Sequence, residues 1–191
     1  MRALVTGGGG FLGSAIARSL HENNHYVSIV GRRQYSHLPK DIQSFQGDIR
    51  DLDFLRKIFS CVDTVFHTAA FPSIWGRAED FYRINVDGTR NVIKACMFGG
   101  VKKLIFTSSP SVIFGKSSLK GVDETTPYPK NYLCEYSRTK AIAEKLVIEA
   151  NGVDLATVSI RPHLIWGPGD PHLVPRILAK ADKGRLMRVG M

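Results

Sequence analysis

Residues 5–13 read Val-Thr-Gly-Gly-Gly-Gly-Phe-Leu-Gly, and this stretch decides the fold class. Apolar residues 3–5 are typical of a short buried strand, and residues 11–17 begin a helical pattern. Gly7, Gly10 and Gly13 let the loop turn tightly and bring backbone N–H groups close to a phosphate. The N-terminus of the new helix also favours an anion. Glycine-rich loops occur as ordinary turns too, but strand, loop and helix in this order predict nucleotide binding.

The bulk composition fits one domain, or one domain with part of another, because the chain has 191 residues and is 43% hydrophobic. No run of about eighteen apolar residues occurs, so we expect no membrane span. The first strand begins almost at Met1, which leaves no room for a signal peptide. Cys61, Cys96 and Cys134 are scattered and fit neither a disulfide framework nor a zinc site. We therefore expect a cytoplasmic protein that holds no metal.

The net charge is +9, and a basic balance can indicate nucleic acid as a partner. Here the positive charge is spread along the chain, and the only doublets are Arg32-Arg33 and Lys102-Lys103. A solvated basic surface together with a phosphate-bearing cofactor explains this charge, so we expect no nucleic acid partner.

Strand and helix patterns alternate along the rest of the chain. The predicted strands after the first are residues 26–30, 64–67, 103–108 and 155–160, and the predicted helices are 11–23, 51–60, 78–98, 135–150 and 173–184. Helical crossovers between strands imply a parallel sheet with helices on both faces, which is a doubly wound α/β fold of the Rossmann type. Gly88 interrupts the third helical pattern, and Asn151-Gly152 ends the fourth. The long irregular stretch 115–131 is predicted to be a mobile flap beside a site.

Tyr136 and Lys140 stand at positions i and i+4 of a predicted helix, so they share one face. A phenol has a pKa near 10 and is a proton donor, but a poor base, at neutral pH. An adjacent ammonium favours the phenolate, lowers that pKa and eases proton exchange. The same lysine can donate hydrogen bonds to a ribose hydroxyl. Taken alone, the two residues are explained equally well as an ordinary exposed pair.

Hydroxyl side chains follow the strand at 103–108, in the segment 106–112 that reads Phe-Thr-Ser-Ser-Pro-Ser-Val. Open α/β sheets bind ligands at the carboxyl ends of their strands, so one of these hydroxyls could hold a carbonyl oxygen beside Tyr136. Serines at a strand end are also common turn formers. His67 ends another strand, and we interpret it as structural rather than catalytic.

In combination, these motifs resemble the extended short-chain dehydrogenase/reductases, which are nicotinamide-dependent oxidoreductases and epimerases with a Rossmann core. The matching segments follow the order of the family over the whole chain: 6–13, 47–49, 67–70, 85–89, 107–109, 136–140 and 161–169. The chain is most similar to the 3β-hydroxysteroid dehydrogenase-like branch. Residues 108–114 are similar to sterol-4-carboxylate 3-dehydrogenases, and residues 160–170 to bacterial 2-alkyl-3-oxoalkanoate reductases. Both groups act on a β-hydroxy or β-keto acid that carries a large apolar group.

The resemblance implies a role for each matching residue. Tyr136 would be the acid/base, and Lys140 would tune it and hold the nicotinamide ribose. Ser109, with Ser108 as the alternative, would bind the substrate oxygen, and Asn85 would support the lysine through water. The implied cofactor contacts are the glycine loop (Gly7, Gly10, Phe11, Leu12, Gly13), Asp48 and Ile49 at the adenine, Ala69 and Ala70 along the cofactor backbone, and Pro162 beside the nicotinamide. Without the resemblance, Asn85 would be a helix residue that bonds locally, and Asp48 would be a turn former. Ala69 and Ala70 would be small residues at a strand end.

The residues after the second strand bear on the choice of nicotinamide cofactor. The Rossmann fingerprint for NAD has an acidic residue there, which bonds the ribose 2′-hydroxyl. This chain has Gly31-Arg32-Arg33 instead, with no carboxylate to repel a 2′-phosphate. Arginine binds phosphate through paired, charge-assisted hydrogen bonds, so we predict NADP in preference to NAD. The alternative is that both arginines face solvent and either cofactor binds.

The chain is much shorter than members of this family normally are. We expect residues 1–160 to form the dinucleotide-binding domain and residues 161–191 to begin a smaller substrate-binding region. We favour a truncated chain over a naturally short relative, because helix 173–184 would otherwise have few partners for its apolar face. The residues that select the apolar small-molecule substrate would then lie mostly outside this sequence. Many family members dimerise through two long helices, here 78–98 and 135–150, which makes a homodimer possible.

Three classes of function are compatible with these motifs. The leading hypothesis is an oxidoreductase in which Tyr136 gives or takes the proton. The second is an isomerase or lyase of nucleotide sugars, although dehydratases usually carry Thr-Asp-Glu where residues 108–110 read Ser-Ser-Pro. The third is a non-catalytic NADPH-binding protein, although such relatives typically lose the tyrosine and lysine pair that this chain keeps.

Overall fold

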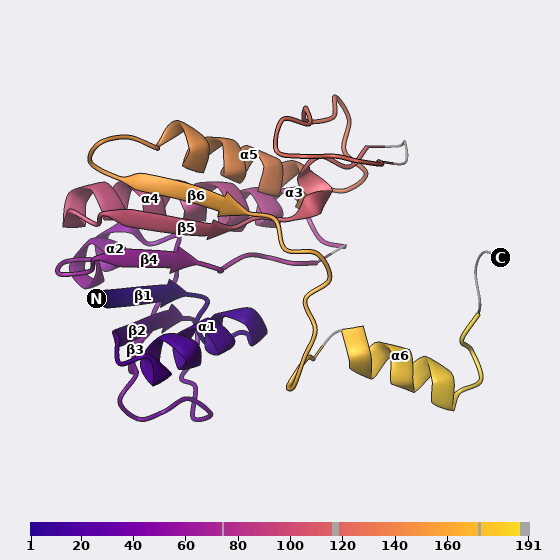
Figure 1. Ribbon diagram of the computed structural model, residues 1–191, viewed down its shortest axis with the longest axis horizontal. Helices are drawn as coiled ribbons and strands as arrows, with labels where there is room; N and C mark the ends of the chain where they lie inside the picture. The colour runs from indigo at the N-terminus through magenta and orange to yellow at the C-terminus, as the bar shows by residue number, and fades with distance from the viewer. Residues whose placement is uncertain (74, 116–118, 172, 188–191) are drawn as a thin grey trace.

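The computed structural model describes residues 1–73, 75–115, 119–171 and 173–187. In these residues a parallel sheet of six strands has the order β3-β2-β1-β4-β5-β6 (Figure 1). The strands are β1 (Arg2–Thr6), β2 (Tyr26–Gly31), β3 (Gln43–Gln46), β4 (Thr64–His67), β5 (Lys103–Thr107) and β6 (Ala156–Ile160). This is the strand order of dinucleotide-binding folds, so the predicted Rossmann fold is confirmed.

The register of the sheet brings the carboxyl ends of the central strands together. Thr6 at the end of β1 lies opposite Val30 of β2 and His67 of β4, and His67 lies opposite Phe106 of β5. The chain crosses from β3 back to β4 on the other side of β1, so the strand order reverses between β1 and β4. A sheet of this kind opens a ligand crevice at that reversal, directly beyond Thr6.

Helices cover the two faces of the sheet unequally. They are α1 (Phe11–Glu22), α2 (Leu52–Ile58), α3 (Ala78–Phe81), the π-helix η1 (Tyr82–Asp87), α4 (Gly88–Gly99), the 3₁₀-helix η2 (Pro110–Val112), α5 (Glu135–Glu149) and α6 (Leu173–Asp182). The larger core cluster joins α2, α4 and α5 to the sheet through residues such as Leu55, Val92 and Val147. The smaller cluster packs α1 against β1 and β2 through Ala17 and Ile29.

Two features of this fold were not predicted from the sequence. The strand β3 was missed because its residues are polar and only Phe45 among them is half-buried. The predicted helix 78–98 forms, but its interruption is the π-helix η1 rather than a break at Gly88. Gly88 itself is required by close packing, because an added Cβ there would lie 2.5 Å from Cδ1 of Ile49.

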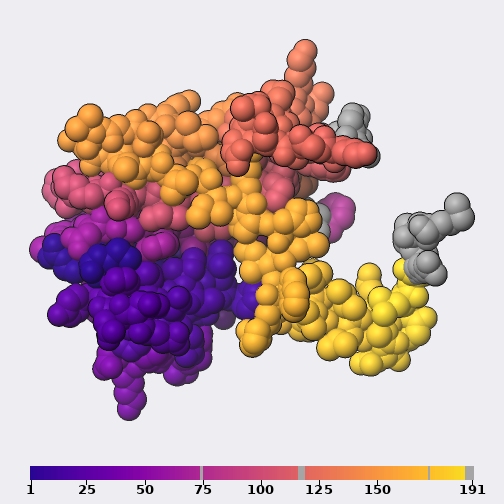
Figure 2. All heavy atoms as spheres, viewed as in Figure 1, coloured from indigo at the N-terminus to yellow at the C-terminus, as the bar shows by residue number. Residues whose placement is uncertain are grey.

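The segment after β6 runs past the carboxyl ends of the strands and then leaves the sheet (Figure 1). Its helix α6 forms where the sequence predicts an amphipathic helix, yet α6 buries no residue. Figure 2 shows α6 standing out from the body of the molecule. Part of the predicted flap, residues 116–118, lies outside the described residues. None of the helices in the described part of the chain has the length and apolar character that a bilayer span requires.

Candidate functional site

The glycine loop between β1 and α1 is folded tightly at the crevice. Gly7 has a φ of +69° and donates its N–H to the Val30 carbonyl at 2.8 Å, and Gly10 donates to the Gly7 carbonyl at 2.9 Å. A Cβ on Gly7 would lie 2.9 Å from Cα of Ala69, and one on Gly13 would lie 2.2 Å from the Gly7 carbonyl oxygen. No side chain caps α1 at Gly10, so its first N–H groups can meet an anion.

A groove of about 420 Å³ begins at this loop and follows the carboxyl edge of the sheet. Its lining includes ten residues that the sequence assigns to a cofactor: Gly7, Gly10, Phe11, Leu12, Gly13, Arg32, Asp48, Ile49, Ala69 and Ala70. The loop, the ends of β2 and β3 and the end of β4 therefore meet at one surface. Its size and its small-residue cradle fit a dinucleotide phosphate backbone.

Other residues line the groove that sequence reasoning did not assign to it. The Tyr35 ring lies against the glycine loop, since a Cβ on Gly9 would stand 2.1 Å from that ring. Ile165 and Asp170 enter the lining from the segment after β6. Asp170 is buried, and its carboxylate accepts from the backbone N–H groups of Leu173 and Val174 at the start of α6. The sequence signal for these contacts is the Trp-Gly-Pro-Gly-Asp run at 166–170, whose glycines permit a return toward the groove.

Several predicted site residues lie outside this groove lining: Arg33, Asn85, Ser109, Tyr136, Lys140 and Pro162. Arg33 is exposed and Pro162 is half-buried. The other four gather around the end of β5 and the start of α5.

Tyr136 lies in the first turn of α5 and is partly buried. Burial raises the pKa of its phenol, and a hydrogen bond with Ser109 works in the opposite direction. The Ser109 hydroxyl accepts from the Ser111 backbone N–H at 3.2 Å and lies 2.9 Å from the Ser111 hydroxyl, which fixes it at the start of η2. The structure thus pairs Tyr136 with Ser109, whereas the Ser108 hydroxyl is buried and helps to lower the pKa of Glu144.

Lys140 is 2% exposed, and its Nζ donates to the Thr107 carbonyl oxygen at 2.6 Å. The same ammonium lies 3.9 Å from the centroid of the Phe106 ring. Burial lowers the pKa of Lys140 to about 7, and the charge of Glu144 offsets part of this shift. The prediction that Lys140 lowers the pKa of Tyr136 is therefore wrong for this structure. Tyr136 and Lys140 share a helix face, but the lysine is directed to the end of β5. Burial is the largest influence on the pKa of the Tyr136 phenol and raises it.

Asn85 lies in the π-helix η1 and is 2% exposed. Its Oδ1 accepts from the Phe71 backbone N–H at 2.8 Å, and its Nδ2 donates to the Thr139 hydroxyl at 3.0 Å. Asn85 therefore ties the loop that lines the groove to the helix that carries Tyr136 and Lys140. Neither contact involves Lys140, so the amide acts here by holding two elements together.

His67 is fully buried between two hydroxyls, with Nδ1 at 2.6 Å from Thr6 and Nε2 at 3.0 Å from Thr89. Burial, helped by the charge of Lys140, lowers its pKa to about 3. A neutral imidazole held on both sides supports the structural interpretation of this residue.

A buried ion pair that sequence reasoning missed stands one turn beyond Lys140. Glu144 is 0% exposed; its carboxylate accepts from the Arg161 guanidinium at 2.6 Å and from the Tyr128 hydroxyl at 2.6 Å. Burial alone would raise the pKa of Glu144, but the hydrogen bonds from Arg161 and Tyr128, helped by the Ser108 hydroxyl, hold it below its ordinary value. The pair ties the 119–131 loop and the segment after β6 to α5. An acidic residue four positions after the lysine was the signal available.

Comparison with known proteins agrees with this geometry. The model of the 3-beta hydroxysteroid dehydrogenase/isomerase family matches residues 4–191. The chain is 44% identical over 194 residues to a 2-alkyl-3-oxoalkanoate reductase of Stenotrophomonas maltophilia, which covers 100% of this chain and 58% of that protein. It is 40% identical over 187 residues to the decarboxylating sterol-4-alpha-carboxylate 3-dehydrogenase of Bos taurus. That alignment covers 97% of this chain and 52% of the relative. The chain thus spans little more than half the length of these curated relatives.

Solved structures with the same fold include proteins in complex with NAD. MoeE5 in complex with UDP-glucose and NAD is 30% identical, with a TM-score of 0.81 over 95% of this chain and 60% of that one. The UDP-glucose 4-epimerase of Thermus thermophilus in complex with NAD is 31% identical, with a TM-score of 0.80 over 94% and 60%. These likenesses extend over the sheet and the groove described above.

Proposed function

The chain belongs to the 3-beta hydroxysteroid dehydrogenase/isomerase family, and we propose that it is the cofactor-binding part of an NAD(P)-dependent oxidoreductase. The substrate would be a secondary alcohol or the corresponding ketone. The observation that carries this proposal is the groove built from the glycine loop and the ends of β2, β3 and β4. Asn85 joins the wall of that groove to the helix that bears Tyr136 and Lys140.

The residues at the catalytic end have complementary roles in this proposal. A bound nicotinamide supplies the carbon that gives or accepts hydride. Tyr136 exchanges the proton of the substrate oxygen, and Ser109, which works to lower the pKa of the phenol, holds that oxygen. Lys140 is held at Thr107 within reach of the same strand end and would donate to the nicotinamide ribose. Asp48 and Ile49 would contact the adenine, and Pro162 would lie beside the nicotinamide.

For the cofactor, we propose NADP in preference to NAD. Arg32 lines the groove after β2 and is exposed, which suits a 2′-phosphate, whereas Arg33 does not line the groove. An NAD site has an acidic residue directly after the second strand, whereas residues 31–33 of this chain are Gly-Arg-Arg. NAD is the cofactor named for the solved relatives, so both dinucleotides belong in the test.

The names of the relatives support a proposal for the substrate class. We propose a 3-hydroxysteroid or a 3-hydroxy or 3-oxo acid with a large apolar group, as in the names of the similar reductase and dehydrogenases. Residues 161–191 would begin the substrate-binding region, and residues 1–160 would be the dinucleotide-binding domain. A homodimer would form through the continuous helical stretch of α3, η1 and α4 and through α5, which correspond to the predicted helices 78–98 and 135–150.

A second candidate is a nucleotide-sugar epimerase of the same extended family. Its support is the likeness of the fold to UDP-sugar epimerases at 25–31% identity. An epimerase retains its NAD through the reaction, so NAD that remains with the purified protein favours this candidate. A non-catalytic NADP-binding role is the third, and it predicts binding without turnover.

The proposal is tested by fluorescence titration with NADPH and NADH, followed by assays on hydroxysteroid and 3-hydroxy acid panels. Tyr136→Phe should lower turnover by about 10²–10⁴-fold and leave the dinucleotide Kd nearly unchanged. Tyr132→Phe, also half-buried and four residues away, is the matched control and should keep its activity. Absence of dinucleotide binding, or full activity in Tyr136→Phe, contradicts the proposal.

A further inference from the structure

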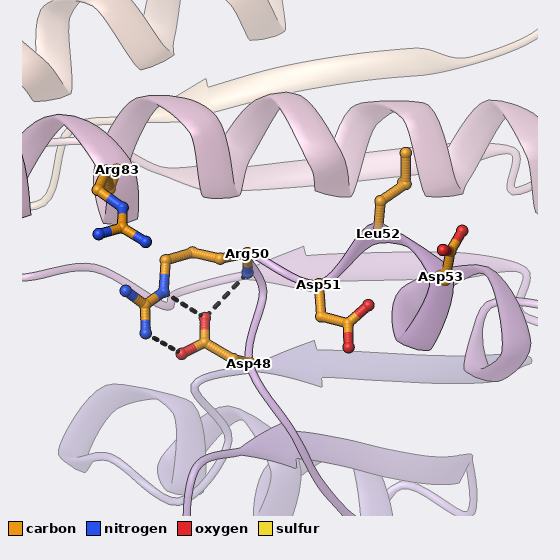
Figure 3. Close-up of a pocket in the computed structure, with 6 residues that line it drawn as sticks. All are labelled: Asp48, Arg50, Asp51, Leu52, Asp53 and Arg83. Atoms are coloured by element: carbon orange, nitrogen blue, oxygen red, sulfur yellow. Dashed lines mark hydrogen bonds and ion pairs between the residues drawn. The ribbon is translucent and has the colours of Figure 1, made fainter.

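The turn that follows β3 carries an ion pair at one end of the groove (Figure 3). Arg50 donates from its backbone N–H and from Nε to Oδ1 of Asp48, at 2.9 and 3.0 Å. Its Nη2 donates to Oδ2 of the same carboxylate at 2.7 Å. Two parallel N–H groups on two carboxylate oxygens form the bidentate arrangement that gives arginine pairs their directional strength. The Asp48 carboxylate is therefore held in one orientation.

The backbone beneath this pair is fixed from two further sides. The Asn91 amide of α4 donates to the carbonyl oxygens of Ile49 and Arg50, at 3.2 and 2.9 Å. Asp51 caps α2 by accepting from the Phe54 backbone N–H at 3.0 Å. A turn anchored at α2 and α4 gives the Asp48 side chain a constant starting point.

Arg50 and Asp48 differ in which surface they reach. Asp48 lines the dinucleotide groove and also an open hollow on its outer side. Arg50 and Arg83 line the outer hollow, and neither of them lines the groove. Figure 3 shows the guanidinium and the carboxylate directed toward one another above the turn. Arg50 thus approaches the carboxylate from outside and leaves acceptor capacity on the groove side, because an ionised carboxylate offers about four lone-pair sites.

We infer that Arg50 is a positioning residue for base specificity, which holds the Asp48 carboxylate as an acceptor for the exocyclic amino group of adenine. This inference rests on the proposed function, in which the groove binds a dinucleotide with its adenine at Asp48. Adenine presents an amino donor at its C6 position, whereas hypoxanthine presents a carbonyl oxygen there. A carboxylate fixed in place accepts from the first and repels the second.

The ionisation of Asp48 agrees with this assignment. The hydrogen bond from Arg50 is the main cause that lowers the pKa of Asp48, with further help from the charge of Arg32, and burial opposes it. The carboxylate therefore stays an acceptor at neutral pH and has no proton to offer a carbonyl oxygen. Without the Arg50 guanidinium, the backbone N–H of residue 50 would still donate to Oδ1, but Oδ2 would lose its partner and the carboxylate could rotate away from the groove.

The test compares the binding of NADPH with that of its hypoxanthine counterpart, by fluorescence titration of the chain. The wild type should prefer NADPH by about tenfold. Asp48→Asn should reverse the preference, because an amide can donate to the hypoxanthine oxygen. Arg50→Gln should reduce the preference to about threefold or less, and Arg50→Lys, which keeps the charge without the fork, should fall between. Arg56→Gln is the matched control, since Arg56 pairs with Asp53 on the exposed side of α2.

The outcomes separate the inference from the function on which it rests. If Arg50→Gln weakens both dinucleotides equally and keeps the wild-type ratio, Arg50 is only structural and the inference is overturned. Equal binding of the two dinucleotides by the wild type also overturns it, while the proposed function stands. If neither dinucleotide binds to the wild type, the proposed function fails as well. Thermal unfolding shows whether each variant is folded. If Arg50→Gln does not fold, the two single variants Arg50→Lys and Asp48→Asn still give the ratio of the two dinucleotide Kd values.

Discussion

The site has two ends, the proposed catalytic end around α5 and the proposed adenosine end at the turns after β2 and β3, and they are held in different ways. At the catalytic end, Asn85, Lys140 and Glu144 are no more than 2% exposed and bond to partners on other elements inside the fold. At the adenosine end, Arg32 and Arg50 are exposed and stand on turns after β2 and β3. Changes at the first end should therefore alter stability as well as chemistry, whereas changes at the second should alter affinity alone.

The physical reason lies in the elements that carry the residues. η1 and α5 pack against the sheet, so any polar side chain on their inner faces must find a partner inside the protein. The turns after β2 and β3 lie at the edge of the sheet, where water can replace a lost partner. This contrast leads us to expect the largest loss of stability from changes at the buried end.

Glu144→Gln should cost about 3 kcal/mol or more of stability, because it leaves the Arg161 guanidinium without its buried counter-charge. Urea unfolding of both proteins measures the change. Glu135→Gln is the matched control, since Glu135 pairs with Arg138 on the same helix but its side chain is 36% exposed. That pair should contribute less than about 1 kcal/mol. Equal losses in the two variants would remove the contrast between buried and exposed pairs.

Gly13→Ala should cost about 1–3 kcal/mol, because the added Cβ would lie 2.2 Å from the Gly7 carbonyl oxygen. The loop must then shift, so the dinucleotide Kd should rise by more than about tenfold. Gly152→Ala is the control, since a Cβ at Gly152 meets no atom within 4 Å. Thermal unfolding and NADPH titration report the two effects, and unchanged binding in Gly13→Ala contradicts the tight-cradle interpretation.

Lys140 should make the stability of the protein depend on pH. Burial lowers the pKa of Lys140 from 10.5 to about 7, so between these values the unfolded chain binds more protons than the folded one. Stability should then rise with pH from about 7 to about 10, by at most about 1.4 kcal/mol per pH unit. Lys140→Met should flatten this rise, whereas Lys145→Met, at an exposed position of α5, should leave it unchanged. Urea unfolding at several pH values measures the free energy of unfolding. If it depends on pH in the same way in wild type and Lys140→Met, Lys140 is not the group responsible for the rise.

Arg32→Gln should raise the Kd for NADPH by about tenfold and leave the Kd for NADH and the stability unchanged. Arg33→Gln should have a smaller effect on NADPH, because Arg33 does not line the groove. Fluorescence titration with both dinucleotides measures this. An equal loss for NADPH and NADH would show that Arg32 does not discriminate the 2′-phosphate.

The fold was predictable because its signals are local. The glycine run at 7–13 and the alternation of strand and helix indicated the doubly wound sheet, and five of the six strands were placed within a residue or two of their observed bounds. β3 escaped prediction because an edge strand with polar residues leaves no periodic apolar signal. The π-helix η1 also escaped prediction, because one π-helical turn within a longer helix leaves no separate periodic signal in the sequence.

By itself the sequence determined which residue types stand at the carboxyl edge of the sheet. That follows because the succession of strands and helices along the chain, the glycine loop and the Tyr136 to Lys140 spacing are all local patterns. Only the tertiary structure decided how those side chains are used. Lys140 turns to the Thr107 carbonyl, Asp48 pairs with Arg50, and Glu144 pairs with Arg161. The Lys140 and Glu144 contacts join residues 33 and 17 positions apart, so no local spacing encodes them. Asp48 and Arg50 meet within one turn, but only the tertiary structure places that turn at the groove.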